Sequence, residues 1–160
     1  MPESARHWTV DRILVAVIAL ITLVGAFIAD FVSSGAAQHI LNPNWPPHAK
    51  FHDAQYVVMS MLLAVIALIL LSRRRFDGYG DLLASAAILA TPWLGMFGAL
   101  MFPGTSMLDP EFDVPSAYVL GLHPQVLIAG VQLAVLLFAV ALATRRRSHA
   151  SGVNASASAR

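Results

Sequence analysis

Residues 42–75 read NPNWPPHAKFHDAQYVVMSMLLAVIALILLSRRR, and this stretch decides the fold. Its first part is polar, aromatic and rich in proline. A hydrophobic segment follows directly, from Tyr56 to Leu71, and three arginines at 73–75 come after it. A proline in the first turn of a helix sacrifices no hydrogen bond, because the N–H it lacks would have no intrahelical partner. The pattern therefore predicts a helix that begins near Pro47 and ends at Ser72.

Three further segments of the chain are similarly apolar. The predicted helices cover residues 13–32, 47–72, 82–102 and 124–144. Between Arg12 and Asp30 the first helix rises about 27 Å, close to the hydrocarbon thickness of a bilayer. The chain is 58% hydrophobic and only 12% charged, about half the charged fraction of a soluble domain. The sequence predicts an all-α integral membrane four-helix bundle within residues 1–147, followed by a disordered cytoplasmic Ser/Ala-rich tail at 148–160.

Basic residues divide unequally between the two sides of such a bundle. If the four helices alternate in direction, nine arginines share the side of both termini, and Lys50 alone lies on the other. The positive-inside rule then places both termini in the cytoplasm and the long connections 34–46 and 103–123 outside a bacterial inner membrane. The arginines are read as topology signals and headgroup contacts, not as a nucleic-acid site. They are Arg6, Arg12, Arg73, Arg74, Arg75, Arg145, Arg146, Arg147 and Arg160.

Two histidines recur at helical spacing near the outer end of the second helix. His48, His52, Gln55 and Met59 fall on one stripe at about 100° per residue. Two imidazoles four residues apart can bind one divalent metal ion, and zinc, iron and copper all accept imidazole. Further ligands could come from His123, His39, Asp30 or the acidic loop. The alternative is an interfacial network in which the histidines bond to loop carbonyls and water. The spacing alone leaves both open.

Polar side chains also occur within the predicted helices. Gln125 and Gln132 lie on one face of the last helix, and Gln132 is about 12 Å from the start of that helix. Together with Gln55 they predict either a polar pocket open to the outside or interhelical hydrogen bonds that hold the bundle together. Asp30 either lies among the headgroups or pairs with Lys50 or a histidine, because an unpaired carboxylate in a membrane is costly.

Three local features complete the structural prediction. Trp45 fits an outer aromatic belt and is also a candidate for the pocket. Gly95 and Gly98 share a face of the third helix, so a neighbouring backbone is expected to approach closely there. Asp81 is the predicted N-cap of that helix. The acidic residues of 109–113 are expected to form a solvated loop.

Several chemistries are excluded by what the chain lacks. Without cysteine there is no disulfide, no thiolate metal site and no cysteine nucleophile. The chain also has no glycine-rich phosphate-binding loop followed by Lys-Ser/Thr and no Gly-x-Ser-x-Gly elbow. Nucleotide hydrolysis and serine-hydrolase chemistry are therefore not indicated.

The remaining polar residues support three functional hypotheses. The first is a membrane protein that binds, or acts as an enzyme on, a small lipophilic or lipid-like molecule, with or without a metal. The second is a structural protein that assists a partner membrane protein or forms a homo-oligomer, and the third is a periplasm-facing metal handler. Whether the chain is an enzyme stays open. The candidate ligand-binding residues are His48, His52, Gln55, His123, Gln125, Asp30 and Trp45.

The segment NPNWPPHAKFH, residues 42–52, stands between the first two of four predicted spans. In this it resembles a group of small, uncharacterised bacterial four-span membrane proteins. The resemblance implies a four-helix membrane bundle, and it implies no activity.

Overall fold

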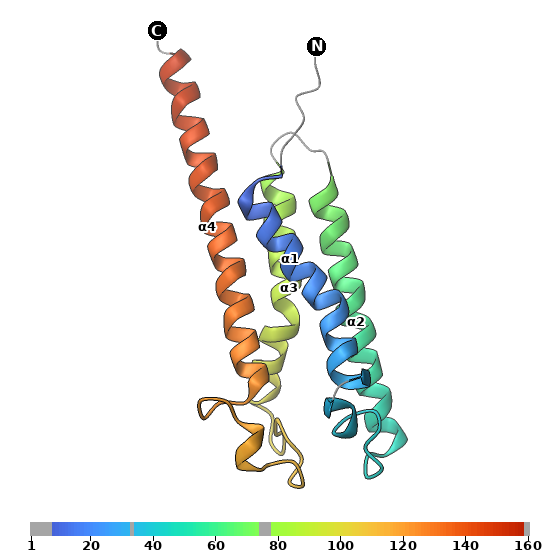
Figure 1. Ribbon diagram of the computed structural model, residues 1–160. Helices are drawn as coiled ribbons and strands as arrows, with labels where there is room; N and C mark the ends of the chain where they lie inside the picture. Colours follow the sequence, from blue (N-terminus) through green and yellow to red (C-terminus); the bar gives the residue numbers. More distant parts are fainter. Residues whose placement is uncertain (1–7, 33, 74–77, 159–160) are drawn as a thin grey trace.

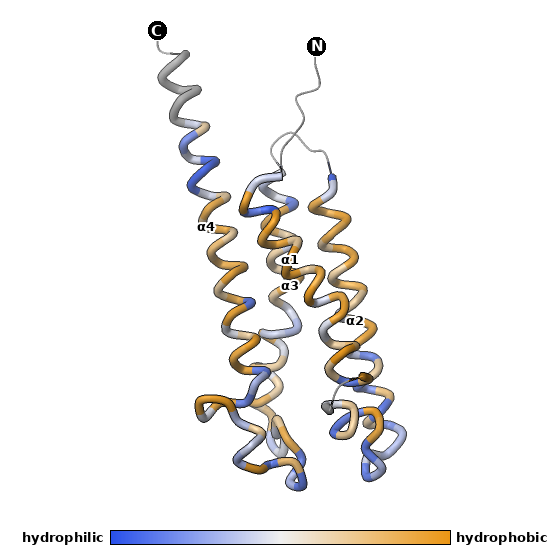
Figure 2. Tube along the Cα trace, viewed as in Figure 1, coloured by the Kyte–Doolittle hydropathy of each residue, from blue (hydrophilic) through white to orange (hydrophobic). Residues whose placement is uncertain are grey.

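The computed structural model describes residues 8–32, 34–73 and 78–158 of the 160-residue chain. Within these ranges the long helices are α1 (Val10–Phe27), α2 (Pro47–Ser72), α3 (Tyr79–Ala99) and α4 (Pro124–Ser158) (Figure 1). Short helical turns are η1 (Ile28–Val32), η2 (Ser34–Ala37) and η3 (Pro115–Ala117). Four helical segments are long and apolar enough to cross a membrane, and Figure 2 shows apolar residues along their lengths. The fold is thus that of an all-helical, multi-pass membrane protein.

The helix bounds follow local signals in the sequence. α2 covers the predicted residues 47–72, with Pro47 as its first residue. α3 begins at Tyr79, earlier than predicted, so the assignment of Asp81 as its N-cap is wrong. Gly78 occupies the N-cap position with a φ of 57°, a left-handed conformation that glycine adopts without steric cost. The turn before α3 therefore depends on this glycine.

α4 continues to Ser158, although the sequence predicts disorder from residue 148 onward. Alanine has the highest helix propensity, so the Ser/Ala-rich composition does not oppose a helix here. The hydroxyl groups of Ser148 and Ser151 donate to the carbonyls of Thr144 and Arg147, one turn back. Each serine thus bonds to the helix that it belongs to instead of competing with it.

The helices form a bundle in which α1 and α3 lie between the other two. α1 and α3 each contact both α2 and α4, and they also contact each other. Small side chains allow the close approach, because backbones separated by alanine or serine can pack tightly. Ser85 on α3 is fully buried, and its hydroxyl group lies 3.1 Å from the carbonyl oxygen of Ala67 on α2. The fully buried alanines are Ala19, Ala64, Ala67, Ala129 and Ala139.

The start of α1, the end of α2, the start of α3 and the C-terminal part of α4 lie at one end of the bundle, here called the terminal end (Figure 1). Arg12 Nη2 donates to the carbonyl oxygen of Leu71 at 2.6 Å, where a positive charge meets the negative end of the α2 dipole. Arg146 forms an ion pair of 2.9 Å with the buried carboxylate of Asp11. These contacts tie α1 to the C-terminal end of α2 and to the part of α4 at this level. Of the nine arginines, Arg6, Arg74, Arg75 and Arg160 lie outside the described residues.

The two long connections meet at the opposite end, here called the connection end. Asn42 is buried, and its Oδ1 accepts a hydrogen bond of 2.8 Å from the backbone N–H of Asn44, which closes a local turn. Asn44 Nδ2 then donates to Glu111 at 3.1 Å, and Trp45 Nε1 donates to Asp109 at 2.7 Å. The polar residues Asn44 and Trp45 therefore join the first connection to the second.

Candidate functional site

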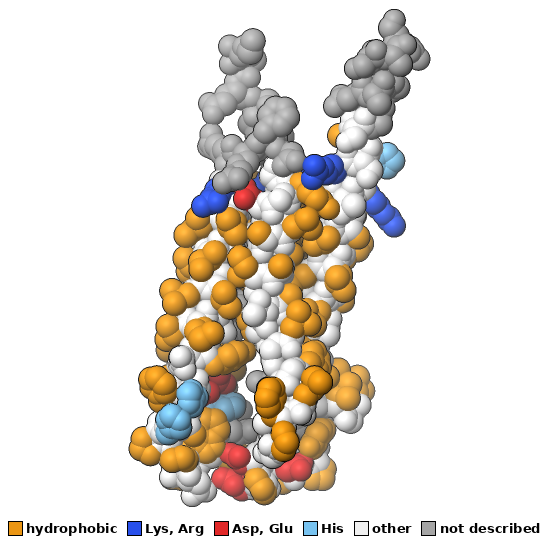
Figure 3. Space-filling model, turned by 180° about the vertical axis from the view of Figure 1, so that it is seen from behind, with side chains coloured by type: hydrophobic (Ala, Val, Ile, Leu, Met, Phe, Trp, Pro, Cys, Tyr) orange, Lys and Arg blue, Asp and Glu red, His pale blue; other side chains and the backbone are white. Residues whose placement is uncertain are grey.

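A cavity of about 590 Å³ lies among the four long helices, in the half of the bundle nearer the connection end. Its wall is mostly apolar and comes from residues 21–30 of α1 and η1, 56–63 of α2, 91–99 of α3 and 125–132 of α4. Figure 3 shows the bundle from behind, with a hollow near the connection end where acidic and histidine side chains gather. The cavity thus combines an apolar interior with a charged mouth.

Glycines on α3 leave space instead of bringing helices together. A Cβ atom added at Gly95 or at Gly98 would meet no atom within 4 Å, so the prediction of close backbone approach at these positions is wrong. Gly95 borders the cavity, as does the buried Pro92 in the same helix. The stripe of small residues therefore contributes volume to the cavity.

Three residues of the cavity wall each carry a buried polar atom that has no hydrogen-bond partner in the part of the chain that the structure describes. The atoms are Thr22 Oγ1, Trp93 Nε1 and Gln132 Oε1, from α1, α3 and α4. Thr22 is 7% exposed and Gln132 is 4% exposed. An indole N–H donates, an amide oxygen accepts and a hydroxyl does both, so together these residues can bond to varied polar groups. They are called the deep polar group below.

The deep polar group also bears on the alternative in which glutamines hold the bundle together. Gln132 Oε1 makes no hydrogen bond within the described ranges, so it does not bond to Gln125. Gln125 also lines the cavity, seven residues before Gln132 on α4 and therefore nearer the connection end. The interpretation of Gln132 as interhelical glue through its amide oxygen is therefore not supported.

The mouth of the cavity is marked by Asp30. It lies in η1, a π-helical turn of five residues, which is a rare local geometry frequent at functional sites. Asp30 is only 5% exposed, and its Oδ1 lies 3.1 Å from His39 Nδ1. The contact is an ion pair when His39 is protonated, although its angles are not those of a hydrogen bond. Among the alternatives for Asp30, the structure thus shows pairing with a histidine.

A second carboxylate lies beside this pair. Asp53 on α2 interacts electrostatically with both Asp30 and His39, and its Oδ2 is buried without a hydrogen-bond partner within the described ranges. Tyr56, one turn further along α2, lines the cavity and bonds to Ser60. Neither Asp53 nor Tyr56 is among the candidate site residues that the sequence indicates. Both adjoin the stripe of His48, His52 and Gln55, called the histidine stripe below.

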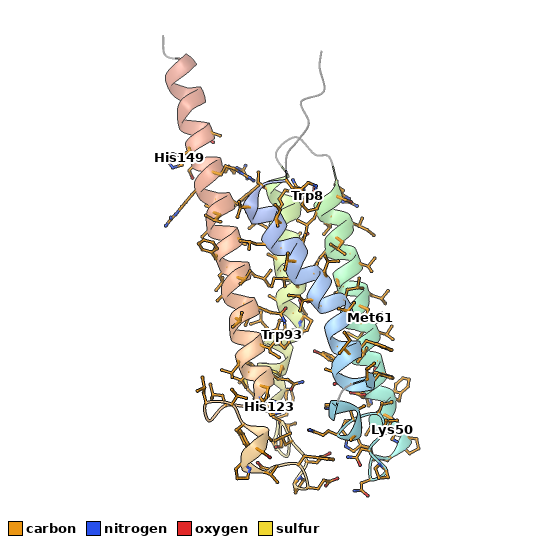
Figure 4. All side chains as sticks on the ribbon, in the orientation of Figure 1. Trp8, Lys50, Met61, Trp93, His123 and His149 are labelled. Atoms are coloured by element: carbon orange, nitrogen blue, oxygen red, sulfur yellow. The ribbon has the colours of Figure 1, made fainter. Side chains whose placement is uncertain are left out.

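His123 is the last residue of the second connection and immediately precedes α4 (Figure 4). Its Nδ1 accepts a hydrogen bond of 3.3 Å from the backbone N–H of Gln125, which satisfies one of the free donors of the first turn. Burial lowers the pKa of His123, and the nearby charge of His39 lowers it further. Both effects favour the neutral imidazole that this cap requires.

The histidine stripe on α2 lies outside the cavity. His48 Nε2 and His52 Nε2 are 3.0 Å apart, and His52 Nδ1 lies 3.2 Å from Gln55 Oε1, all on an exposed face. Gln55 does not line the cavity, so the expectation that Gln55 and Gln125 share one pocket is not met. His123 does not join His48 and His52. Across the described residues, no group of three His, Cys, Asp or Glu side chains is arranged to hold a metal ion.

Trp45 has a structural partner instead of a place in the cavity wall. Its indole N–H bonds to Asp109, and its ring meets the edge of His39 at 5.5 Å between centroids. Asp113 likewise accepts a hydrogen bond of 2.6 Å from the hydroxyl of Tyr118, which raises the pKa of that phenol. The acidic loop, expected to be solvated, thus anchors aromatic and amide groups at the connection end.

The site and fold define a class: a four-helix, multi-pass membrane protein with a cavity between its helices. The model of a family of unknown function (DUF6640) matches residues 14–154, so the chain belongs to that family. This agrees with the resemblance to an uncharacterised group of four-span proteins. No curated protein and no solved structure matches the chain.

Proposed function

We propose that the protein binds a small lipophilic molecule inside the membrane, in the cavity among its four helices. The observation that carries this proposal is the deep polar group, whose three residues line an apolar cavity and each hold a buried polar atom without a hydrogen-bond partner in the described part of the chain. A buried donor or acceptor without a partner costs about 1–3 kcal/mol. A ligand that supplies the missing hydrogen bonds is stabilised at this point of the cavity.

The dimensions and wall chemistry favour the same class of ligand. A volume of about 590 Å³ lies within the range of small-molecule sites, which are mostly apolar with a few placed polar groups. The wall includes Met59, Met96 and Ile128, and methionine adapts its shape to different occupants. The ligand therefore has an apolar body and a group that donates or accepts hydrogen bonds.

We also propose that the mouth of the cavity faces the outer side of a bacterial inner membrane. Arg12, Arg73 and the arginines at 145–147 belong to the terminal end, whereas Lys50 lies on α2 at the connection end (Figure 4). The positive-inside rule assigns the arginine-rich end to the cytoplasm. Both termini are then cytoplasmic, and the ligand enters from the outer side or from the outer leaflet.

The test fills the cavity at a position where a side chain causes no clash. Wild type, Gly95→Leu and Gly98→Leu are purified in detergent, and extracted lipophilic molecules are identified by mass spectrometry. Gly98→Leu is the matched control, because neither glycine has a neighbour within 4 Å but only Gly95 lines the cavity. We expect a polar lipophile with wild type and Gly98→Leu, and its loss from Gly95→Leu. Identical extracts from all three proteins would contradict the proposal.

A further inference from the structure

The connection end carries an excess of negative charge. Asp30, Asp53, Asp109, Glu111 and Asp113 belong to this end, and Lys50 is the one Lys or Arg in the sequence that accompanies them. The three loop carboxylates accept hydrogen bonds from neutral groups, so these contacts leave their charge in place. Such a field raises the local concentration of cations near the mouth of the cavity.

Within the mouth itself, two carboxylates share one imidazole. His39 lies 3.1 Å from Asp30 and also interacts with Asp53, so a single proton on His39 cannot neutralise both acids. Lys50 forms no ion pair with either acid in the described part of the chain. His123 accepts a backbone hydrogen bond through Nδ1, which requires that nitrogen to be unprotonated. At the mouth, the described residues therefore supply at most one cation, His39, for two acids.

Asp30 is the carboxylate that faces a ligand, because it lines the cavity and Asp53 does not. The opposite end of the same cavity holds the deep polar group, with Thr22 and Gln132 more than nine-tenths buried and unpartnered in the described residues. Thr22 lies eight residues before Asp30 in the same helical segment, which places it about 12 Å deeper. The cavity thus offers a negative charge at its mouth and neutral hydrogen-bonding groups at its inner end.

We propose that the ligand is an amphiphilic amine: a protonated amino group that pairs with Asp30, an apolar middle, and an uncharged polar group about 12 Å away that bonds to Thr22, Trp93 and Gln132. This inference rests on the proposed function and specifies the class of ligand. When the amine binds Asp30, His39 remains beside Asp53, with which it also interacts. A negatively charged ligand is disfavoured, because two carboxylates stand at the entrance.

The experiment compares three probes that differ only at one end: 8-amino-1-octanol, 1,8-octanediol and 8-hydroxyoctanoate. Radiolabelled probes are equilibrated with the full chain in phosphatidylcholine nanodiscs, and Gly95→Leu nanodiscs measure partition into lipid alone. We expect the amine to bind about tenfold or more tightly than the diol, a difference of about 1.4 kcal/mol. The carboxylate should bind most weakly.

Variants then assign the charge preference to one side chain. Asp30→Asn should weaken the amine about tenfold and leave the diol unchanged, whereas Asp30→Glu should retain the preference. Asp113→Asn is the control, because it removes an acid from the same end that lies outside the cavity wall. Elution as a single species and an unchanged helical circular dichroism spectrum confirm that each variant is folded.

The outcomes separate this inference from the proposal on which it rests. Equal binding of amine and diol above the Gly95→Leu background, insensitive to Asp30→Asn, would overturn the amine assignment and leave a cavity for neutral lipophiles. Binding of no probe above that background would overturn both. A loss of amine binding in Asp113→Asn as large as in Asp30→Asn would also overturn the assignment, since surface charge would then explain it.

Discussion

The indole of Trp45 donates its N–H to Asp109 at 2.7 Å, and this bond joins two connections that are 64 residues apart in the chain. Beside it, Asn44 bonds to Glu111 in the same pair of connections. At the connection end, side chains from two loops thus bond to one another, whereas at the terminal end arginines on helices bond to neighbouring helices. The bond between Trp45 and Asp109 should therefore contribute to the stability of the connection end.

Trp45→Phe should lower the free energy of unfolding by about 1.5 kcal/mol, because a hydrogen bond to a charged acceptor is lost while most of the ring remains. Denaturation in mixed micelles measures the change. Asp109→Asn and the double variant complete a thermodynamic cycle, in which the double variant should lose little more than either single one. Fully additive losses would show that the two residues act independently.

Gly78→Ala should destabilise the protein more than Gly104→Ala. Both glycines have positive φ, 57° and 80°, so both changes incur the steric penalty of a left-handed residue, about 1–2 kcal/mol. At Gly78 the added methyl group would also clash with the guanidinium group of Arg12, whereas at Gly104 it meets nothing within 4 Å. Melting temperatures in detergent test the order. Equal losses would mean that Arg12 moves aside without cost.

Acidification should weaken the start of α4 through His123. Because burial and His39 lower its pKa, its stabilising contribution is complete above the ordinary value of about 6.5 and is lost as the pH falls through the lowered value. Protonation also removes the Nδ1 acceptor that caps the first turn. Hydrogen exchange of the Gln125 amide, measured between pH 7.5 and pH 5, should show less protection at the lower pH after correction for the intrinsic rate.

His123→Asn is the control for that titration. Asparagine is a good N-cap whose side-chain oxygen accepts a hydrogen bond without titrating in this range. The variant should keep the protection of the first turn of α4 nearly constant with pH. If wild type and His123→Asn respond alike to acid, another group controls the start of α4.

Replacing His48 and His52 together with alanine should leave cavity binding unchanged. The two imidazoles bond to each other on an exposed face, and neither lines the cavity. Binding of 8-amino-1-octanol, measured in nanodiscs against the Gly95→Leu background, should match that of wild type. A loss of affinity comparable to that of Asp30→Asn would show that the histidine stripe contributes to ligand binding.

The sequence predicted elements that depend on local signals. Pro47 and the arginines after Ser72 define α2, because a proline starts a helix and charge ends a membrane segment, and the structure confirms both bounds. Gln125 and Asp30 were named as candidate site residues, and both line the cavity. Buried polar residues are rare in membrane helices because they are costly, so they can be recognised from the sequence alone.

Other parts of the site depend on how helices are rotated against one another, which the period of a single helix does not specify. The stripe that contains Gln55 also contains Met59, yet only Met59 lines the cavity, together with Tyr56 and Ser60 from the adjacent stripe. Likewise, a glycine stripe is compatible with close packing or with empty space. The free polar atoms of Thr22 and Trp93 became apparent only once their neighbours were known.

α4 runs without interruption from Pro124 to Ser158. Its last eleven residues, after Arg147, project about 16 Å beyond the arginines. A protein of 17.1 kDa is small for single-particle imaging, and a continuous helix that extends beyond the bundle is a suitable fusion point. A helical marker domain joined in register after Ser151 would inherit the orientation of the bundle, and it would allow the cavity and its occupant to be imaged directly.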